Sequence, residues 1–179
     1  MGLRKEEYLP HYMYDDYIQW EGDWEIIGGT AFAMSPAPMK KHQYVSSNIA
    51  YELKNSLKDC KNCQAYLPID WKIAEDTVVQ PDNLVLCNDN DNASYITKAP
   101  LIIFEILSKS TAMKDQHLKY ELYQQEGVTY YIIVNPDDEV VKLYKLTNGK
   151  YIKEGDFDKQ SYTFEIDNCE VVFDFSKIW

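Results

Sequence analysis

Two acidic residues stand where the chain could build a proton-sharing pair or a metal site. Asp82 follows Gln80 and Pro81, and Glu105 comes 23 positions later, directly after the apolar run 101–104. A carboxylate that closes a buried strand is costly unless it is paired or binds a cation. On neighbouring strands the two would share a proton or hold a divalent cation. The alternative is that Asp82 caps a turn and Glu105 faces solvent.

A basic residue follows these acids in the sequence. Leu118 and Leu122 predict the inward stripe of a helix over residues 114–126, and Lys119 lies just to one side of that stripe. Its ammonium group is therefore expected to reach the rim of the sheet, partly exposed. The alternative is a surface pair with Asp115, four residues earlier, worth a few tenths of a kcal/mol.

The rest of the chain predicts a sheet-rich fold with two principal helices. A first helix over 41–58 carries an apolar stripe of Val45, Ile49, Leu53 and Leu57, with His42 at its N-terminal end. The second helix stops at a glycine, residue 127. Strand runs are expected at 24–27, 30–34, 64–73, 78–86, 101–107, 130–134, 140–146 and 150–153, with further short strands in 162–179. The class is α/β or mixed α+β, with a mixed sheet flanked by helices.

Composition narrows the class of protein. The 179 residues are 45% hydrophobic and 26% charged, as expected of one globular domain over residues 1–179. A formal charge of −11 argues against a broad, non-specific nucleic-acid binder, though a local basic groove or a metal site is compatible with it. The N-terminus has no apolar signal segment and no run is long enough to span a bilayer, so a cytoplasmic location is expected.

Four cysteines raise the question of a metal or redox site. Cys60 and Cys63 form a C-x-x-C pair, whereas Cys87 and Cys169 are isolated. A zinc site needs a second closely spaced pair of ligands, and a redox pair should open a helix after a strand. Neither pattern is present, so we favour structural cysteines over a metal or redox role.

An ordered set of motifs resembles one known family, the Uma family of bacterial "putative restriction endonucleases", assigned to the PD-(D/E)XK nuclease superfamily. The motifs run in order along most of the chain. They are Trp24-Glu25-Ile26-Ile27-x-Gly29, Met34-Ser35-Pro36, Lys41-His42-Gln43, Pro81-Asp82, Phe104-Glu105-Ile106-Leu107-Ser108, Asp115-x-x-x-Lys119-x-x-x-Tyr123 and Gly127-Val128-x-x-Tyr131-x-Ile133-Val134-x-Pro136.

The resemblance implies a restriction-endonuclease-like core and a metal site. Asp82 and Glu105 would be the metal ligands, together with the main-chain carbonyl of Ile106, and the cation would be Mg²⁺ or Mn²⁺. Leu107 stands where the superfamily pattern has its lysine. Lys119 would then be a displaced version of that lysine, with Lys109 as the alternative.

Two further residues are candidates for the rim of this site. Glu25 could be a third acid or an outer-sphere ligand, or else a polar strand residue. His42 could orient phosphate or water, or else satisfy local hydrogen bonds at a helix start.

The function implied is a Mg²⁺-dependent endonuclease that hydrolyses DNA phosphodiester bonds, assisted by Lys119. Replacing this lysine by alanine is expected to abolish cleavage and leave folding nearly intact, as for a partly exposed side chain. The alternative is a catalytically inactive nuclease fold that serves as a binding or assembly module. A different metal hydrolase is less favoured because the three histidines form no H-E-x-x-H motif. A homodimer is also expected, with the short apolar strands within 162–179 as its contact surface. The alternative is that the aromatic side chains of these strands complete the core.

Overall fold

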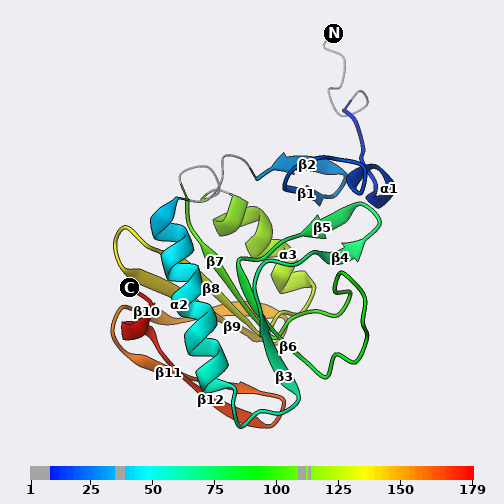
Figure 1. Ribbon diagram of the computed structural model, residues 1–179. Helices are drawn as coiled ribbons and strands as arrows, with labels where there is room; N and C mark the ends of the chain where they lie inside the picture. Colours follow the sequence, from blue (N-terminus) through cyan, green and yellow to red (C-terminus); the bar gives the residue numbers. More distant parts are fainter. Residues whose placement is uncertain (1–8, 35–38, 109–111, 113) are drawn as a thin grey trace.

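The largest sheet has six strands and is mixed. The computed structural model describes residues 9–34, 39–108, 112 and 114–179 (Figure 1). In the sheet order β10-β9-β8-β7-β6-β3, only the β7–β8 pair is parallel. The strands are β3 (Cys63–Tyr66), β6 (Asn83–Cys87), β7 (Ile102–Ile106), β8 (Tyr130–Asn135), β9 (Val140–Thr147) and β10 (Lys150–Phe157).

The parallel pair needs a crossover connection, and a helical segment supplies it. This segment consists of the π-helix η2 (Lys114–Leu118) and the α-helix α3 (Lys119–Gln125). Gly127 follows with a φ of +82°, a conformation that glycine adopts readily after a helix. The expected extent of the second helix is therefore confirmed, whereas its π-helical first turn was not foreseen.

A second sheet lies beside the first and has the order β2-β1-β5-β4. Its strands are β1 (Trp24–Ile27), β2 (Thr30–Ala33), β4 (Trp71–Ala74) and β5 (Thr77–Val79). The sequence suggested one strand over 78–86, but the structure divides this run between the two sheets. The break falls at Gln80, Pro81 and Asp82, where proline has no N–H to donate to a ladder. Asp82 therefore lies where the chain passes from one sheet to the other.

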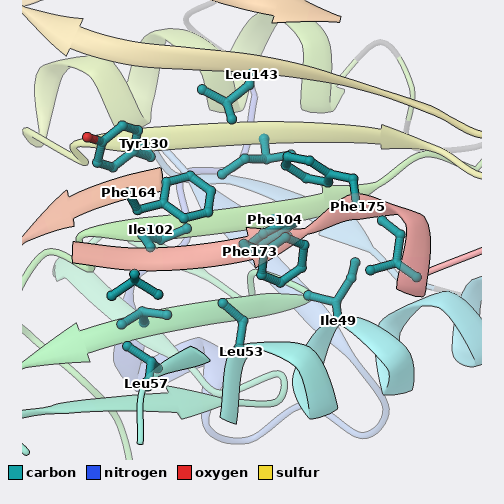
Figure 2. Close-up of a cluster of buried hydrophobic side chains, with 14 of the residues drawn as sticks. Ile49, Leu53, Leu57, Ile102, Phe104, Tyr130, Leu143, Phe164, Phe173 and Phe175 are labelled. Carbon is teal, nitrogen blue, oxygen red and sulfur yellow. The ribbon is translucent and has the colours of Figure 1, made fainter. Parts of the chain in front are cut away.

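Helix α2 (Lys40–Ser56) covers one face of the six-stranded sheet, and its predicted stripe is confirmed. Val45, Ile49 and Leu53 are buried on it, and they contact the side chains of alternate sheet residues. Figure 2 shows this core, to which Phe164 and Phe173 are added from the last two strands. Those strands are β11 (Ser161–Ile166) and β12 (Cys169–Asp174), and they are followed by the 3₁₀-helix η3 (Phe175–Lys177).

The three phenylalanines of the tail complete the core. Phe164, Phe173 and Phe175 are each 0% exposed, and Val172 is the exposed large apolar residue of these strands within the described chain. These phenylalanines do not contribute to the surface on which a homodimer was expected. The homodimer itself stays a prediction.

The opposite face of the six-stranded sheet packs against α3. Ile103, Tyr131 and Ile133 cluster there with Tyr123 of α3 and Trp71 of β4. Side chains alternate between the faces of a strand. Glu105 therefore shares the α3 face with Ile103, two residues earlier.

All four cysteines are paired, which supports the structural interpretation. Cys60 bonds to Cys169 across 109 positions, and Cys63 bonds to Cys87 across 24 positions. The C-x-x-C cysteines thus have separate partners: one joins the end of α2 to β12, and the other joins β3 to β6. Disulfides are uncommon in a reducing cytosol. They do not favour the cytoplasmic location, which stays a prediction.

The expected class, a mixed sheet flanked by helices, is confirmed. A single domain over residues 1–179 stays a prediction. Among the described residues, no helix combines the length and apolar character needed to cross a bilayer.

The short helix α1 (Tyr14–Tyr17) precedes β1. In Figure 1 the β1–β2 hairpin and the start of the η2–α3 segment both lie toward the upper edge of the six-stranded sheet.

Candidate functional site

Asp82 and Glu105 lie on adjacent segments of the six-stranded sheet. Strands β6 and β7 are antiparallel, and their ladder ends with Asn83 opposite Phe104. Asp82 and Glu105 are the next residue on each segment beyond that last pair. That the two carboxylates share one site stays a prediction, because Asp82 contacts the main-chain N–H of Ile106 and His42 of α2, whereas Glu105 contacts α3.

Asp82 is held by two groups at the end of its strand. Its Oδ2 accepts a hydrogen bond of 2.7 Å from the main-chain N–H of Ile106 and lies 3.2 Å from Nε2 of His42. The Asp82 side chain is 15% exposed, so it remains in reach of solvent and ligands. His42 is in place because α2 begins beside this strand end. Ser46, one turn later, exchanges two hydrogen bonds with Asn83.

Glu105 is far more enclosed. Its side chain is 4% exposed, and Oε1 accepts hydrogen bonds from Nζ of Lys119 at 2.8 Å and from the hydroxyl of Tyr123 at 2.7 Å. Both donors come from α3, one helical turn apart. The helix therefore orients Glu105 as well as covering it.

Lys119 is buried, which corrects the expectation of a partly exposed side chain at the rim. It is 1% exposed, whereas Leu118, expected on the inward stripe, is 36% exposed. The buried residues of α3 are Lys119 and Tyr123, one position beyond the predicted stripe of Leu118 and Leu122. The π-helical turn explains this shift, because it contains about one residue more than an α-helical turn.

Glu25 joins the site from the second sheet. It is 0% exposed, and its Oε1 lies 2.7 Å from Nζ of Lys119 and accepts the main-chain N–H of Gln80 at 2.8 Å. Its Oε2 forms an ion pair with Lys114. Burial alone would raise the pKa of Glu25, but the two lysines lower it below the ordinary carboxyl value. Glu25 is thus an ionised group in a closed charge network.

The π-helix also explains how two lysines reach one carboxylate. Lys114 and Lys119 are five positions apart, at the first residue of η2 and directly after its last. In an α-helix that spacing turns the two side chains well away from each other, whereas a π-helix brings residues five apart into register. Single-turn π-helical segments are frequent at functional sites.

The donor set fits a small, hard cation. Mg²⁺ prefers oxygen ligands and is usually held by one or two carboxylates plus waters and substrate phosphates. Asp82 and Glu105 supply two such carboxylates. Within the described residues no group of three or more His, Cys, Asp or Glu side chains is arranged to bind a metal. A site of two carboxylates, with the carbonyl of Ile106 as a further ligand, stays a prediction.

One functional neighbour, Tyr123, appeared only as part of a motif, although its spacing of four from Lys119 predicts a shared helix face. The contact of Lys114 with Glu25 was not foreseen, because it depends on the π-helical turn. The alternative lysine, Lys109, lies outside the described residues, as does the side chain of Asp115, so the proposed surface pair is not described.

Much of the acidic charge lies away from these residues. A hollow of about 320 Å³ is lined by the acids Asp138, Glu139, Asp156 and Asp158, together with Val140, Phe157, Lys159 and Trp179. None of these residues belongs to the network around Glu105. The net charge of −11 is therefore not a measure of the local charge at the site.

Comparisons with known proteins agree with this architecture. The model of the Uma2 family, described as "Putative restriction endonuclease", matches residues 14–163. The crystal structure of a "putative nuclease belonging to DUF820" from Anabaena variabilis ATCC 29413 is similar, with a TM-score of 0.73 and 17% sequence identity. The similarity covers 93% of this chain and 96% of that one. No curated protein matches.

Proposed function

Because the chain belongs to the Uma2 family, described as "Putative restriction endonuclease", we propose that it is a Mg²⁺- or Mn²⁺-dependent endonuclease that hydrolyses DNA phosphodiester bonds. One observation carries the proposal: Asp82 and Glu105 directly flank Asn83 and Phe104, the last pair of the β6–β7 ladder, and the buried ammonium group of Lys119 contacts Glu105. Two carboxylates and a lysine are the groups that metal-assisted phosphodiester hydrolysis requires.

Each residue has a distinct task in this proposal. Asp82 and Glu105 would hold the cation, which supplies a Lewis acid and a water of lowered pKa. His42 lies against Asp82 and fixes the direction of its carboxylate. Lys119 places a positive charge beside Glu105, where it can stabilise negative charge that develops on a phosphoryl oxygen. Water adds to phosphorus, the bond to the sugar oxygen breaks, and that oxygen takes up a proton.

The test is cleavage of plasmid and linear duplex DNA with Mg²⁺, with Mn²⁺ and with a chelator. Asp82→Asn and Glu105→Gln should reduce cleavage to the level seen with chelator, because each removes a ligand charge. Glu121→Gln, an exposed acid on the same helix α3, is the matched control and should cleave as wild type does. Cleavage that persists in chelator or in both ligand variants would refute the metal-dependent assignment.

A second candidate, a non-catalytic module that keeps the fold, has one observation in its favour. Lys119 and Lys114 are engaged by carboxylates, so they do not present open charge to a phosphate backbone. Binding of labelled duplex in Ca²⁺ at two salt concentrations separates the candidates, because phosphate contacts weaken steeply with salt. No binding at low salt would favour the module.

Sedimentation over a range of concentrations tests the proposed homodimer.

A further inference from the structure

Glu25 is a buried carboxylate that the proposed reaction leaves without a task. It comes from β1 of the four-stranded sheet, whereas the proposed metal ligands come from the six-stranded sheet. Its exposure is 0%, and it contacts two lysines, the buried Lys119 at 2% and the partly buried Lys114 at 11% side-chain exposure. A buried ion pair is costly to desolvate. Hydrophobic packing could fill the same space at lower cost, so this arrangement calls for a functional reason.

The functional reason for burying Glu25 follows from the two carboxylates that Lys119 contacts. Its Nζ lies 2.8 Å from Glu105 and 2.7 Å from Glu25, so one ammonium group bridges two carboxylates. A divalent cation on Glu105 would weaken the hold of that carboxylate on Lys119 and would repel the ammonium group directly. With Glu105 as the sole partner, the lysine would compete with the cation for the same carboxylate. A second carboxylate removes this conflict.

We propose that Glu25 is a positioning residue that keeps Lys119 beside Glu105 when a divalent cation is bound there. The inference rests on the proposed function and deepens it, because it explains how a lysine and a cation can occupy one site together. The Glu25 contact holds Lys119 in place and offsets its charge, so that the cation can bind Glu105 without displacing the lysine.

The surroundings of Glu25 suit this task. The N–H of Gln80 and Nζ of Lys119 both contact Oε1, and Lys114 contacts Oε2, so both oxygens are fixed. Glu25 also stands inside a hairpin, paired with Phe32 of β2. The carboxylate therefore does not depend on the cation for its orientation. The four-stranded sheet becomes part of the site although it supplies no proposed metal ligand.

The experiment is a Mn²⁺ titration by calorimetry on wild type, Glu25→Gln, Lys119→Met and the double variant. Glu25→Gln should weaken Mn²⁺ binding about 10-fold, because Lys119 loses its contact with Glu25 and competes more strongly with the cation for Glu105. Lys119→Met should bind Mn²⁺ at least as tightly as wild type. In the Lys119→Met background, Glu25→Gln should change the affinity less than about 3-fold, because Glu25 acts through the lysine.

Two further variants serve as a matched control and as a charge-conserving replacement of Glu25. Glu52→Gln alters another buried glutamate that pairs with a lysine, Lys177, and should leave Mn²⁺ affinity unchanged. Glu25→Asp keeps the charge one methylene shorter, and it should recover most of the Mn²⁺ affinity even if Glu25→Gln folds poorly. In cleavage assays Glu25→Gln should lower kcat by about 10-fold or more, with the KM for DNA nearly unchanged.

The outcomes separate this inference from the proposed function. Wild-type affinity and wild-type cleavage in Glu25→Gln would overturn the positioning role while leaving the nuclease intact. Equal weakening by Glu25→Gln in both Lys119 backgrounds would also overturn it, since Glu25 would then act by its charge alone. If wild type itself binds no Mn²⁺ and cleaves nothing, the proposed function fails and the inference fails with it.

Discussion

Glu25 and Glu52 are buried glutamates that pair with lysines, and their pairs are built differently. Glu25 is 0% exposed, and its partners are the buried Lys119 and the partly buried Lys114. Glu52 of α2 is 4% exposed, but its partner, Lys177 of η3, is 57% exposed, with an Nζ–Oε1 distance of 3.2 Å. Oε2 of Glu52 has no hydrogen-bond partner within the described chain.

The pair of Glu52 and Lys177 is a surface ion pair, here called the clasp. Glu25, Lys114, Lys119 and Glu105 form a closed network of charges. Lys177 keeps most of its hydration, so its pair with Glu52 joins the C-terminal segment to α2 at little desolvation cost. The Glu25 network removes several charges from water and is stable only because each charge meets an opposite one. We infer that the closed network is retained for the chemistry at Asp82 and Glu105, and the clasp for the packing of the C-terminus.

The largest effect should come from removing the central cation of the closed network. Lys119→Ala leaves Glu25 and Glu105 buried with fewer partners and should cost about 3–5 kcal/mol of unfolding free energy. This replaces the expectation of nearly intact folding that followed from a partly exposed lysine. Urea unfolding gives the value. Lys177→Ala is the matched control, and a loss equal to that of Lys119→Ala would remove the contrast between the two pairs.

A smaller effect is expected at the hydroxyl that shares Glu105 with Lys119. Tyr123→Phe removes a hydrogen bond to a buried carboxylate and should cost about 1.5–3 kcal/mol. Tyr151→Phe loses a hydrogen bond to the neutral carbonyl of Val128 and should cost about 1 kcal/mol. The two variants are compared by urea unfolding. A smaller loss for Tyr123→Phe than for Tyr151→Phe would mean that Tyr123 is not part of the charged network.

The pH dependence of stability tests whether Glu25 is ionised in the folded protein. Two lysines hold its pKa below the ordinary value of 4.5 despite burial. A lowered folded-state pKa gives stability that is complete above the unfolded pKa and is lost as the pH falls through the folded value. Wild type should therefore lose this contribution only below pH 4.5. Glu25→Gln should lack that acid-dependent loss, as followed by urea unfolding from neutral pH into the acid range. Parallel pH curves for the two proteins would contradict the assignment.

The smallest effect is expected at Glu52. Because one of its oxygens is buried without a partner, Glu52→Gln gives up the ion pair with Lys177 but also reduces a desolvation cost. The unfolding free energy should change by less than about 1 kcal/mol. Thermal unfolding at neutral pH gives the change. A loss as large as that of Lys119→Ala would show that the clasp is as essential to the fold as the closed network.

Local patterns predicted the first helix and the turn between β9 and β10. The stripe of α2, with Val45, Ile49 and Leu53 buried, follows from a spacing of four. The strand runs expected at 140–146 and 150–153 form β9 and β10, and Asn148 and Gly149 between them have φ values of +51° and +76°, as is typical of an Asn-Gly hairpin turn. The family motifs pointed to Asp82 and Glu105, which directly flank the last pair of the β6–β7 ladder.

Tertiary structure alone decided how the charges are combined. The sequence offered Glu25 as a rim residue and Lys119 as a partly exposed one, yet the packing of one sheet against the helical crossover brings both into a buried network. The π-helical turn moved the buried face of α3 by one residue, which an α-helical periodicity does not predict. Sequence spacing reports contacts within one helix or strand. The contact between Glu25 and Lys119 joins residues 94 positions apart, and it forms only when two sheets and a helix pack together.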